Sequence, residues 1–291
     1  MKLSECIYKY VITKSAEVDQ GRLAKGTLTH IKCDLAKVSR ALGHLETSEI
    51  DFAVVQDFSN SMTSLSGKSI SNLLVNFKTM MAWAKKRKII NDVPEFPTIR
   101  YELGWRKTID RATQLKILAH IEARASERTA MAFRWLMTYT ALRPGELPQI
   151  TLDDISSDGI LTIKKHKVSR SSSIPKEIPL LTEDFLKVKV IDDGSGGHIF
   201  KHGKKPGCAP NHPFGEKYLR DVWKRACQAC GVKGVDLYGG VRHSTQQFYR
   251  QHMSFEDCLR LSQHTTSKAG ERYLKINHDE LRRGYRLSRE R

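Results

Sequence analysis

Apolar residues recur every three to four positions along most of the first hundred residues of this chain. The pattern is clearest over residues 27–42 and 69–90. Because an α-helix has about 3.6 residues per turn, this spacing predicts helices that each bury one face. A shorter helix is expected over residues 49–58, with Thr47 or Ser48 as its N-cap. The N-terminal part of the chain is therefore expected to be entirely helical.

The helical pattern is interrupted over residues 91–105, which contain two prolines. Pro94 and Pro97 lack a backbone N–H and disfavour helix in the residues before them. A chain of 291 residues has room for two modest domains, and this interruption is the best candidate for a linker. We therefore expect a helical domain with its linker over residues 1–104 and a second domain over residues 105–291.

Both helical and β-like patterns occur in the expected second domain. Helical periodicity returns over residues 113–122 and 128–140. Residues 160–163 and 174–181 have strand character, and the polar stretch between them is typical of a hairpin loop. Helices are expected again from about Thr182. The sequence thus predicts a mainly α protein, in which the second domain is mixed α/β, mostly helical with a small antiparallel sheet.

The chain is strongly basic. It has 49 lysines and arginines against 32 aspartates and glutamates, which gives a formal net charge of +17. A positive field of this size attracts polyanions, so nucleic acid is a more natural partner than an acidic protein. The alternative is a protein that is basic only for solubility. A basic run where the helix over 69–90 ends offers either phosphate contacts or a solvated helix end: Lys85, Lys86, Arg87 and Lys88.

Composition and spacing argue against several other classes. The chain is 40% hydrophobic and 28% charged, as globular proteins are, and no apolar stretch reaches the ~20 residues of a membrane helix. The N-terminus lacks the basic-then-apolar layout of a secretion signal, so a cytoplasmic location is expected. Cys227 and Cys230 have metal-ligand spacing, but they fall in a helical pattern that favours buried thiols over zinc.

Three local clusters place a charge or a nucleophile where helical periodicity does not require one. In residues 140–147, Arg143 stands at an expected helix end, and Glu146 is spaced to hold its guanidinium. In residues 237–244, Arg242 follows two glycines and precedes an expected helix. Each arginine alone is as well explained by a structural ion pair or a turn.

The third cluster pairs His264 with Tyr273, nine residues later. Singly, these are explained by a surface histidine and a tyrosine at the edge of the core. In this order, and with lysines of the expected hairpin between the two arginines, the clusters resemble the tyrosine recombinase (phage integrase) family. The family's first motif, ALRxxEL, is matched at residues 141–147, and its second, an arginine before a histidine, at Arg242 and His243.

The resemblance extends over nearly the whole chain. It implies that residues 1–104 form a helical, SAM-like core-binding domain that contacts DNA. Residues 105–291 would then be the catalytic domain of a DNA strand-exchange enzyme that performs phosphoryl transfer through a covalent tyrosine.

The chemistry that the resemblance implies suits these residue types. Arg143 and Arg242 would hold the non-bridging oxygens of a phosphodiester and stabilise its pentavalent transition state. Tyr273 would attack phosphorus to form a 3′-phosphotyrosine intermediate. His264 would hydrogen-bond a phosphate oxygen or help to hold the nucleophile.

The leaving 5′ oxygen needs a proton, which in the family comes from a hairpin lysine. Counting along the hairpin assigns this role to Lys167, with Lys165 as the second candidate. The family commonly has a histidine three residues before the second arginine, as a candidate base for the tyrosine. This chain has Gly239 there, so Tyr238 or His243 takes over part of that role, or the arginines lower the pKa of the tyrosine.

The resemblance also implies partners. The expected substrate is double-stranded DNA with inverted-repeat core sites, bound by a homotetramer that assembles from monomers or dimers, with DNA-bending accessory proteins as further partners. No membrane, metal or nucleotide cofactor is expected. Integration or excision of a mobile genetic element, at the nucleoid of a prokaryotic or phage-type system, is the implied setting. The alternatives are a type IB topoisomerase-like DNA relaxase and a non-catalytic, sequence-specific DNA-binding protein.

Overall fold

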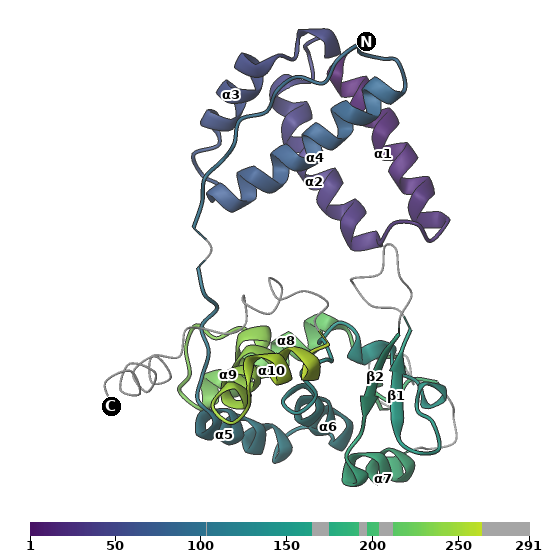
Figure 1. Ribbon diagram of the computed structural model, residues 1–291, viewed down its shortest axis with the longest axis vertical. Helices are drawn as coiled ribbons and strands as arrows, with labels where there is room; N and C mark the ends of the chain where they lie inside the picture. The colour runs from purple at the N-terminus through teal and green to yellow at the C-terminus, as the bar shows by residue number, and fades with distance from the viewer. Residues whose placement is uncertain (103, 165–174, 192–196, 204–211, 264–291) are drawn as a thin grey trace, which may run out of the picture. The chain divides into compact units, whose positions relative to one another are not determined.

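The computed structural model describes residues 1–102, 104–164, 175–191, 197–203 and 212–263 (Figure 1). Contacts between Cα atoms divide the chain into two compact units, one up to Gly104 and one from Trp105 onwards. Within the described ranges, no helix combines the length and the hydropathy that crossing a bilayer requires.

The N-terminal unit is helical, as its periodicity predicts. Its elements are α1 (Leu3–Asp19), α2 (Lys25–Leu42), a 3-10 turn (Thr47–Glu49), α3 (Phe52–Ser61) and α4 (Gly67–Lys86). The apolar faces of α1, α2 and α4 meet in one core, in which the ring of Tyr10 packs edge-on against Trp83 with centroids 5.4 Å apart. The two long helices expected here are confirmed to within a few residues.

The third helix of this unit begins later than expected, and its predicted cap is wrong. The Asp51 side chain accepts a hydrogen bond from the Val54 backbone N–H (2.9 Å), so the helix begins at Phe52. Thr47 instead belongs to the preceding 3-10 turn, where its hydroxyl donates to the Met1 carbonyl oxygen (2.6 Å). Asp51 therefore sets the start of this helix, while Thr47 is engaged in a long-range contact with the chain terminus.

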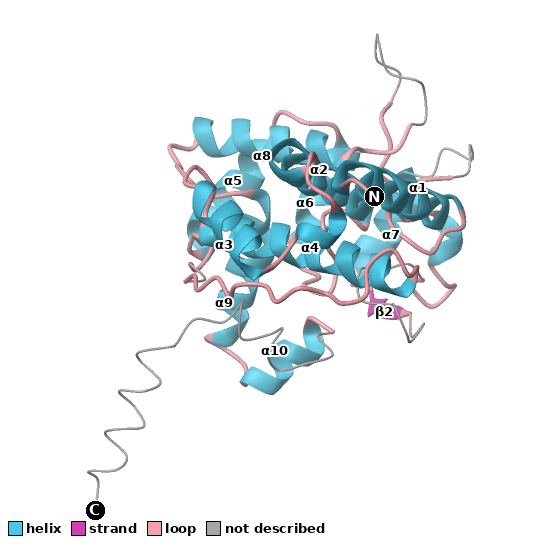
Figure 2. Cartoon of the chain, turned by 90° about the horizontal axis from the view of Figure 1, so that it is seen from above, coloured by secondary structure: helices cyan, strands magenta, loops and turns pink. Residues whose placement is uncertain are grey.

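The second unit contains six α-helices and one hairpin among its described residues. The elements are α5 (Arg111–Glu122), α6 (Glu127–Leu136), 3-10 turns (Leu147–Gln149 and Leu152–Asp154), β1 (Ile160–Ile163), β2 (Lys176–Pro179), α7 (Thr182–Ile191), α8 (Glu216–Ala229), the π-helix η4 (Gly239–His243), α9 (Ser244–Arg250) and α10 (Phe255–Leu261). Figure 2 shows how far helix predominates over strand.

The two strands pair antiparallel, with Ile160 opposite Pro179 and Ile163 opposite Lys176. The predicted hairpin is thereby confirmed, as is the predicted fold class: a helical unit followed by a mostly helical unit with a small antiparallel sheet.

Aromatic rings fill the core of the second unit. Phe133 of α6 stacks on Trp223 of α8, with ring centroids 6.2 Å apart. Trp135, two residues further along α6, packs edge-on against Phe200 at 5.2 Å. Such large buried rings contribute strongly to stability through the apolar area that they remove from water. The core therefore fixes α6 firmly against α8.

The turn of η4 packs so closely against α8 that only glycine fits at its second position. A Cβ added to Gly240 would lie 1.8 Å from the Trp223 ring, which is itself completely buried and donates its Nε1–H to the Val235 carbonyl oxygen (3.0 Å). Since the ring is held by the core on one side and by this hydrogen bond on the other, it has no room to move away.

Replacing Gly240 with alanine is therefore expected to lower the free energy of unfolding by about 3 kcal/mol, through overlap with the indole. Urea unfolding of the full chain, followed by tryptophan fluorescence, measures the change. Gly26→Ala in α2 is the matched control, because no atom lies within 4 Å of its added Cβ. A loss below about 1 kcal/mol for Gly240→Ala would show that η4 separates easily from α8.

Candidate active site

Arg143 is held in a tight turn by the carboxylate of Glu146. The backbone N–H of Arg143 donates to Glu146 Oε2 (2.9 Å), and its Nη1 donates to Oε1 (3.0 Å). The turn lies seven residues beyond the end of α6 at Leu136, and so Arg143 is not at a helix end as expected. Because one carboxylate binds both the backbone and the guanidinium, the same side chain shapes the turn and aims the arginine.

A buried lysine that the sequence analysis missed completes this arrangement. Lys176, the first residue of β2, donates from Nζ to both carboxylate oxygens of Glu146 (2.7 Å each) and to the Ala141 carbonyl oxygen (3.0 Å). It is only 5% exposed. The available signal was its place on the inward face of the predicted strand, in alternation with Ile178.

The charges around Glu146 act on one another. Burial lowers the pKa of Lys176 to about 8; the negative charge of Glu146 opposes this shift, and the positive charges of Arg143 and Arg242 add to it. The second arginine therefore lies close enough to be felt by the cluster. One carboxylate in contact with two cationic side chains, and a third cation close enough to act on Lys176, leave a net positive site, which favours an anion.

Arg242 is completely buried in the π-helix η4, which leads directly into α9, so it precedes a helix as expected. Gln114 of α5 holds this wide turn: its Nε2 donates to the carbonyl oxygens of Gly240 (2.9 Å) and Val241 (3.1 Å), and lies 2.9 Å from Thr245 Oγ1. Sequence reasoning missed Gln114, although a glutamine at a core position of a predicted helix was a signal. π-Helical turns often occur at functional sites, because they re-aim a side chain.

The first residue of η4 leaves no room for a side chain. A Cβ on Gly239 would lie 2.4 Å from the Lys107 carbonyl oxygen and 3.0 Å from Asp236 Oδ1, to which the Gly239 N–H donates (2.6 Å). The histidine that the family commonly has at this position would therefore collide with the backbone of residue 107. In this chain the backbone carbonyl of Lys107 occupies the space that such a side chain would need.

The two residues suggested as replacements for this histidine differ in character. His243 is 7% exposed, and its pKa is lowered to about 4 by burial and then by the positive charges of Arg106 and Arg242. A histidine with so low a pKa is a poor general base at neutral pH. Tyr238 is half-buried, and the guanidinium of Arg106 lies 5.5 Å from the centroid of its ring.

The remaining predicted catalytic side chains lie outside the described residues: Lys165, Lys167, His264 and Tyr273. The residues next to them in sequence are described. Gln263 donates from Nε2 to the Glu177 carbonyl oxygen of β2, and Gln246 of α9 donates to Ser262 Oγ. The chain that leads to His264 thus leaves from a point beside β2.

The basic run at the end of α4 is partly engaged by local contacts. Lys85 pairs with Asp92 (2.8 Å), and the guanidinium of Arg87 lies 5.5 Å from the centroid of the Trp83 ring. Lys88 adopts a left-handed conformation with φ of 57°. Lys85 and Arg87 are thus engaged within the protein, and phosphate contacts by this run stay a prediction.

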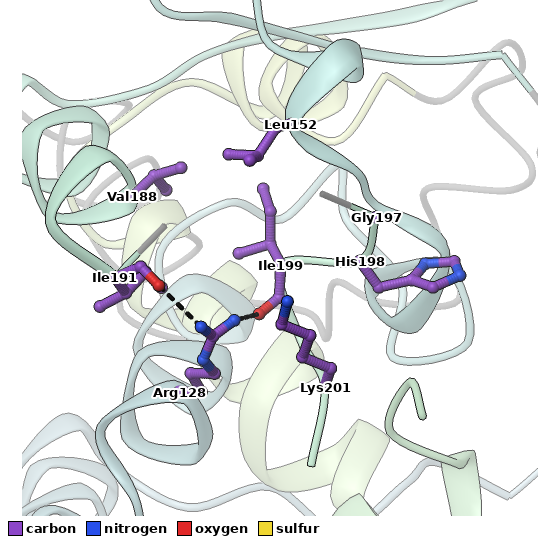
Figure 3. Close-up of a pocket in the computed structure, with 8 residues that line it drawn as sticks. All are labelled: Arg128, Leu152, Val188, Ile191, Gly197, His198, Ile199 and Lys201. Carbon is purple, nitrogen blue, oxygen red and sulfur yellow. Dashed lines mark hydrogen bonds between the residues drawn. The ribbon is translucent and has the colours of Figure 1, made fainter. Parts of the chain in front are cut away.

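A small cavity in this unit lies beside Arg128, which bridges two segments of the fold (Figure 3). Arg128 donates to the carbonyl oxygens of Ile191 (2.7 Å) and Ile199 (2.9 Å), and so ties the start of α6 to the end of α7. The cavity has a volume of about 10 Å³, which is room for one water molecule at most.

No metal centre is found among the described residues, where no group of three or more histidine, cysteine, aspartate or glutamate side chains has suitable geometry. Cys227 is buried in α8, and burial raises the pKa of its thiol to about 11. Since the thiolate is the form that binds metal, this environment disfavours a zinc ligand.

Comparison with known proteins identifies the fold. No protein-family model matches the sequence, and a search of curated proteins finds no match. Among solved structures, a lambda integrase tetramer bound to a Holliday junction matches with a TM-score of 0.73 and 16% identity, over 94% of this chain and 78% of that one.

Two further structures agree. A lambda integrase dimer bound to a COC′ core site has a TM-score of 0.72 and 14% identity, over 94% of this chain and 95% of that one. The Tn1549 transposon integrase in complex with transposon right end DNA has a TM-score of 0.72 and 14% identity, over 99% of this chain and 100% of that one. The chain thus has the fold of the tyrosine recombinases, as the resemblance predicted.

The low pKa of His243 predicts a pH-dependent stability. Its native-state pKa of about 4 lies below the ordinary value of 6.5, so the unfolded state binds the proton more readily. The stabilisation is present above pH 6.5 and is lost as the pH falls towards 4, by up to about 3 kcal/mol. Urea unfolding at intervals between pH 7 and pH 4 is expected to show this loss in the natural chain and not in His243→Gln.

The exposed His252, replaced by glutamine, is the matched control for this experiment. It is expected to keep the pH dependence of the natural chain. An identical slope in His243→Gln and the natural chain would contradict a buried, neutral His243.

Proposed function

We propose that this chain is a site-specific tyrosine recombinase, which cuts and rejoins duplex DNA through a 3′-phosphotyrosine intermediate. The observation that carries the proposal is a positive cluster in a unit with the tyrosine recombinase fold: Arg143 and Lys176 contact the Glu146 carboxylate, and Arg242 is close enough for its charge to act on Lys176. Such a preorganised positive site stabilises charge that develops on a phosphodiester during its displacement.

Each predicted residue has a role in the proposed reaction. Arg143 and Arg242 bind the non-bridging oxygens of the phosphate. The hydroxyl of Tyr273 releases its proton to solvent water and its oxygen attacks phosphorus, and the bond from phosphorus to the 5′ oxygen breaks while Lys167 donates a proton to that oxygen. His264 hydrogen-bonds the phosphate. In the reverse direction a 5′ hydroxyl attacks the phosphotyrosine, so the bond energy is kept for rejoining without a cofactor.

The substrate and assembly follow from charge and from the similar structures. A net charge of +17 suits a protein that contacts many phosphates. One of the similar structures is a lambda integrase tetramer on a Holliday junction, and another is a dimer on a core site. We therefore propose a tetramer on paired inverted-repeat sites, with residues 1–104 as the core-binding domain and residues 105–291 as the catalytic domain.

Covalent trapping tests the activity without knowledge of the target site. The probe is a pool of nicked duplexes with randomised arms on both sides of a short spacer, from which the cleaved strand diffuses away and leaves protein attached to DNA. The natural chain is expected to enrich inverted repeats as covalent adducts. Tyr273→Phe is expected to form no adduct and yet bind the enriched duplex with unchanged affinity, because it loses one hydroxyl and no charge.

Tyr8→Phe, at a tyrosine that is 68% exposed on α1, is the matched control and should retain adduct formation. Binding of the enriched duplex by the natural chain without any adduct would favour the non-catalytic DNA-binding alternative. Adducts on sites without repeat symmetry, formed by a monomer, would favour the topoisomerase-like alternative.

A change of leaving group distinguishes the roles of the two hairpin lysines, Lys165 and Lys167. A 5′ sulfur in place of the bridging oxygen leaves without a proton, so it should cancel the loss of a general acid and of nothing else. Lys167→Ala is expected to be severely slow on ordinary DNA and nearly normal on the 5′-thio substrate in single-turnover cleavage. Lys165→Ala should show a mild defect that sulfur does not repair. Rescue of Lys165→Ala instead would exchange the two roles.

A further inference from the structure

All three N–H donors of the Lys176 ammonium group have hydrogen-bond acceptors within the protein. A lysine ammonium has three N–H donors, and here two groups take them up: both oxygens of the Glu146 carboxylate at 2.7 Å and the Ala141 carbonyl oxygen at 3.0 Å. With a side chain only 6% exposed, Lys176 has no donor left for a substrate while these bonds persist. Its role in the site must therefore act through the groups that it holds.

Lys176 and Arg143 share the Glu146 carboxylate, and the hydrogen bonds from Lys176 are shorter than the one from the Arg143 guanidinium. The guanidinium of Arg143 has five N–H donors, and among the described residues Glu146 receives a side-chain hydrogen bond from only one of them, Nη1 at 3.0 Å. Without Lys176, only Arg143 among these described residues holds the carboxylate, and a rotation that exchanges the bond from the Arg143 backbone N–H for a second guanidinium bond gives a two-pronged pair, the geometry that such pairs favour. That pairing would take up donors that an anion needs.

The position of Lys176 joins three segments of the site. As the first residue of β2, it pairs with Ile163, the last residue of β1. Its bond to Ala141 reaches the turn of Arg143. The next residue, Glu177, accepts from Gln263 at the end of α10. The start of β2 thus connects the arginine turn, β1 and the residues that follow α10.

We propose that Lys176 is a positioning residue of the recombination reaction: it holds the Glu146 carboxylate in place and thereby keeps the Arg143 guanidinium available to the phosphate and fixed relative to β2. This inference rests on the proposed function. It accounts for a charge at a place where an apolar side chain would fill the same volume without the desolvation penalty of a buried ion.

The test compares the cleavage rate with DNA affinity in Lys176→Met, which keeps the length of the side chain and removes its charge. Single-turnover adduct formation is measured at saturating protein on the duplex enriched by the natural chain. The rate is expected to fall about 10- to 100-fold, because a misplaced catalytic group costs this much, while affinity changes less than about threefold. Partial unfolding alone would lower the apparent affinity and leave the saturating rate unchanged.

Lys187→Met is the matched control, because Lys187 forms a surface ion pair with Glu127 (3.0 Å) away from the cluster. It is expected to cleave at the natural rate. The double variant Glu146→Gln with Lys176→Met removes both buried charges and restores stability to a chain that Lys176→Met destabilises. Its rate should stay low, since the single amide oxygen of glutamine replaces only one of the two oxygens that hold Arg143.

The outcomes separate this inference from the proposed function. If the natural chain forms no adduct, the proposed function fails. If the natural chain cleaves and Lys176→Met cleaves at the same saturating rate, the positioning role is wrong while the function stands. A double variant that is stable and cleaves within about threefold of the natural rate would equally overturn it, because the lysine would then serve only to neutralise Glu146.

Discussion

The buried carboxylate of Glu146 is the interaction on which the candidate site depends. It accepts hydrogen bonds from the backbone and side chain of Arg143 and from the ammonium of Lys176. An ion in the interior is tolerated only when its partners satisfy it, so removal of either cation leaves oxygen lone pairs of the buried carboxylate without a donor. The turn after α6 and the start of β2 are therefore fixed relative to each other by electrostatics as well as by packing.

The second arginine depends on a different constraint, which is steric. Gly239 and Gly240 allow η4 to lie against the Lys107 backbone on one side and the Trp223 ring on the other, and Gln114 satisfies its carbonyl groups. A wide turn in this place buries Arg242 completely and keeps it close to the Glu146 cluster. The site thus combines an electrostatic anchor for one arginine with a packing anchor for the other.

Much of the fold was predictable from the sequence because it is encoded locally. Helical periodicity predicted the helices over residues 27–42 and 69–90, and the polar stretch between two apolar runs predicted the hairpin, since both patterns depend on neighbours within a few residues. Arg143, Glu146 and Arg242 were found in the same way, from short motifs. The sequence also supplied the net charge of +17, which favours nucleic acid as the partner.

Only the tertiary structure decided which distant side chains complete the site. Lys176 meets Glu146 across 30 residues of sequence, and Gln114 meets η4 across more than 120. No local pattern distinguishes a lysine that folding buries against a carboxylate from one that remains in water. The steric exclusion at Gly239 is likewise visible only once the Lys107 backbone lies against it. Local propensity determined the elements, whereas long-range contacts determined which polar groups they enclose, because the cost of burying charge depends on partners that only the fold brings together.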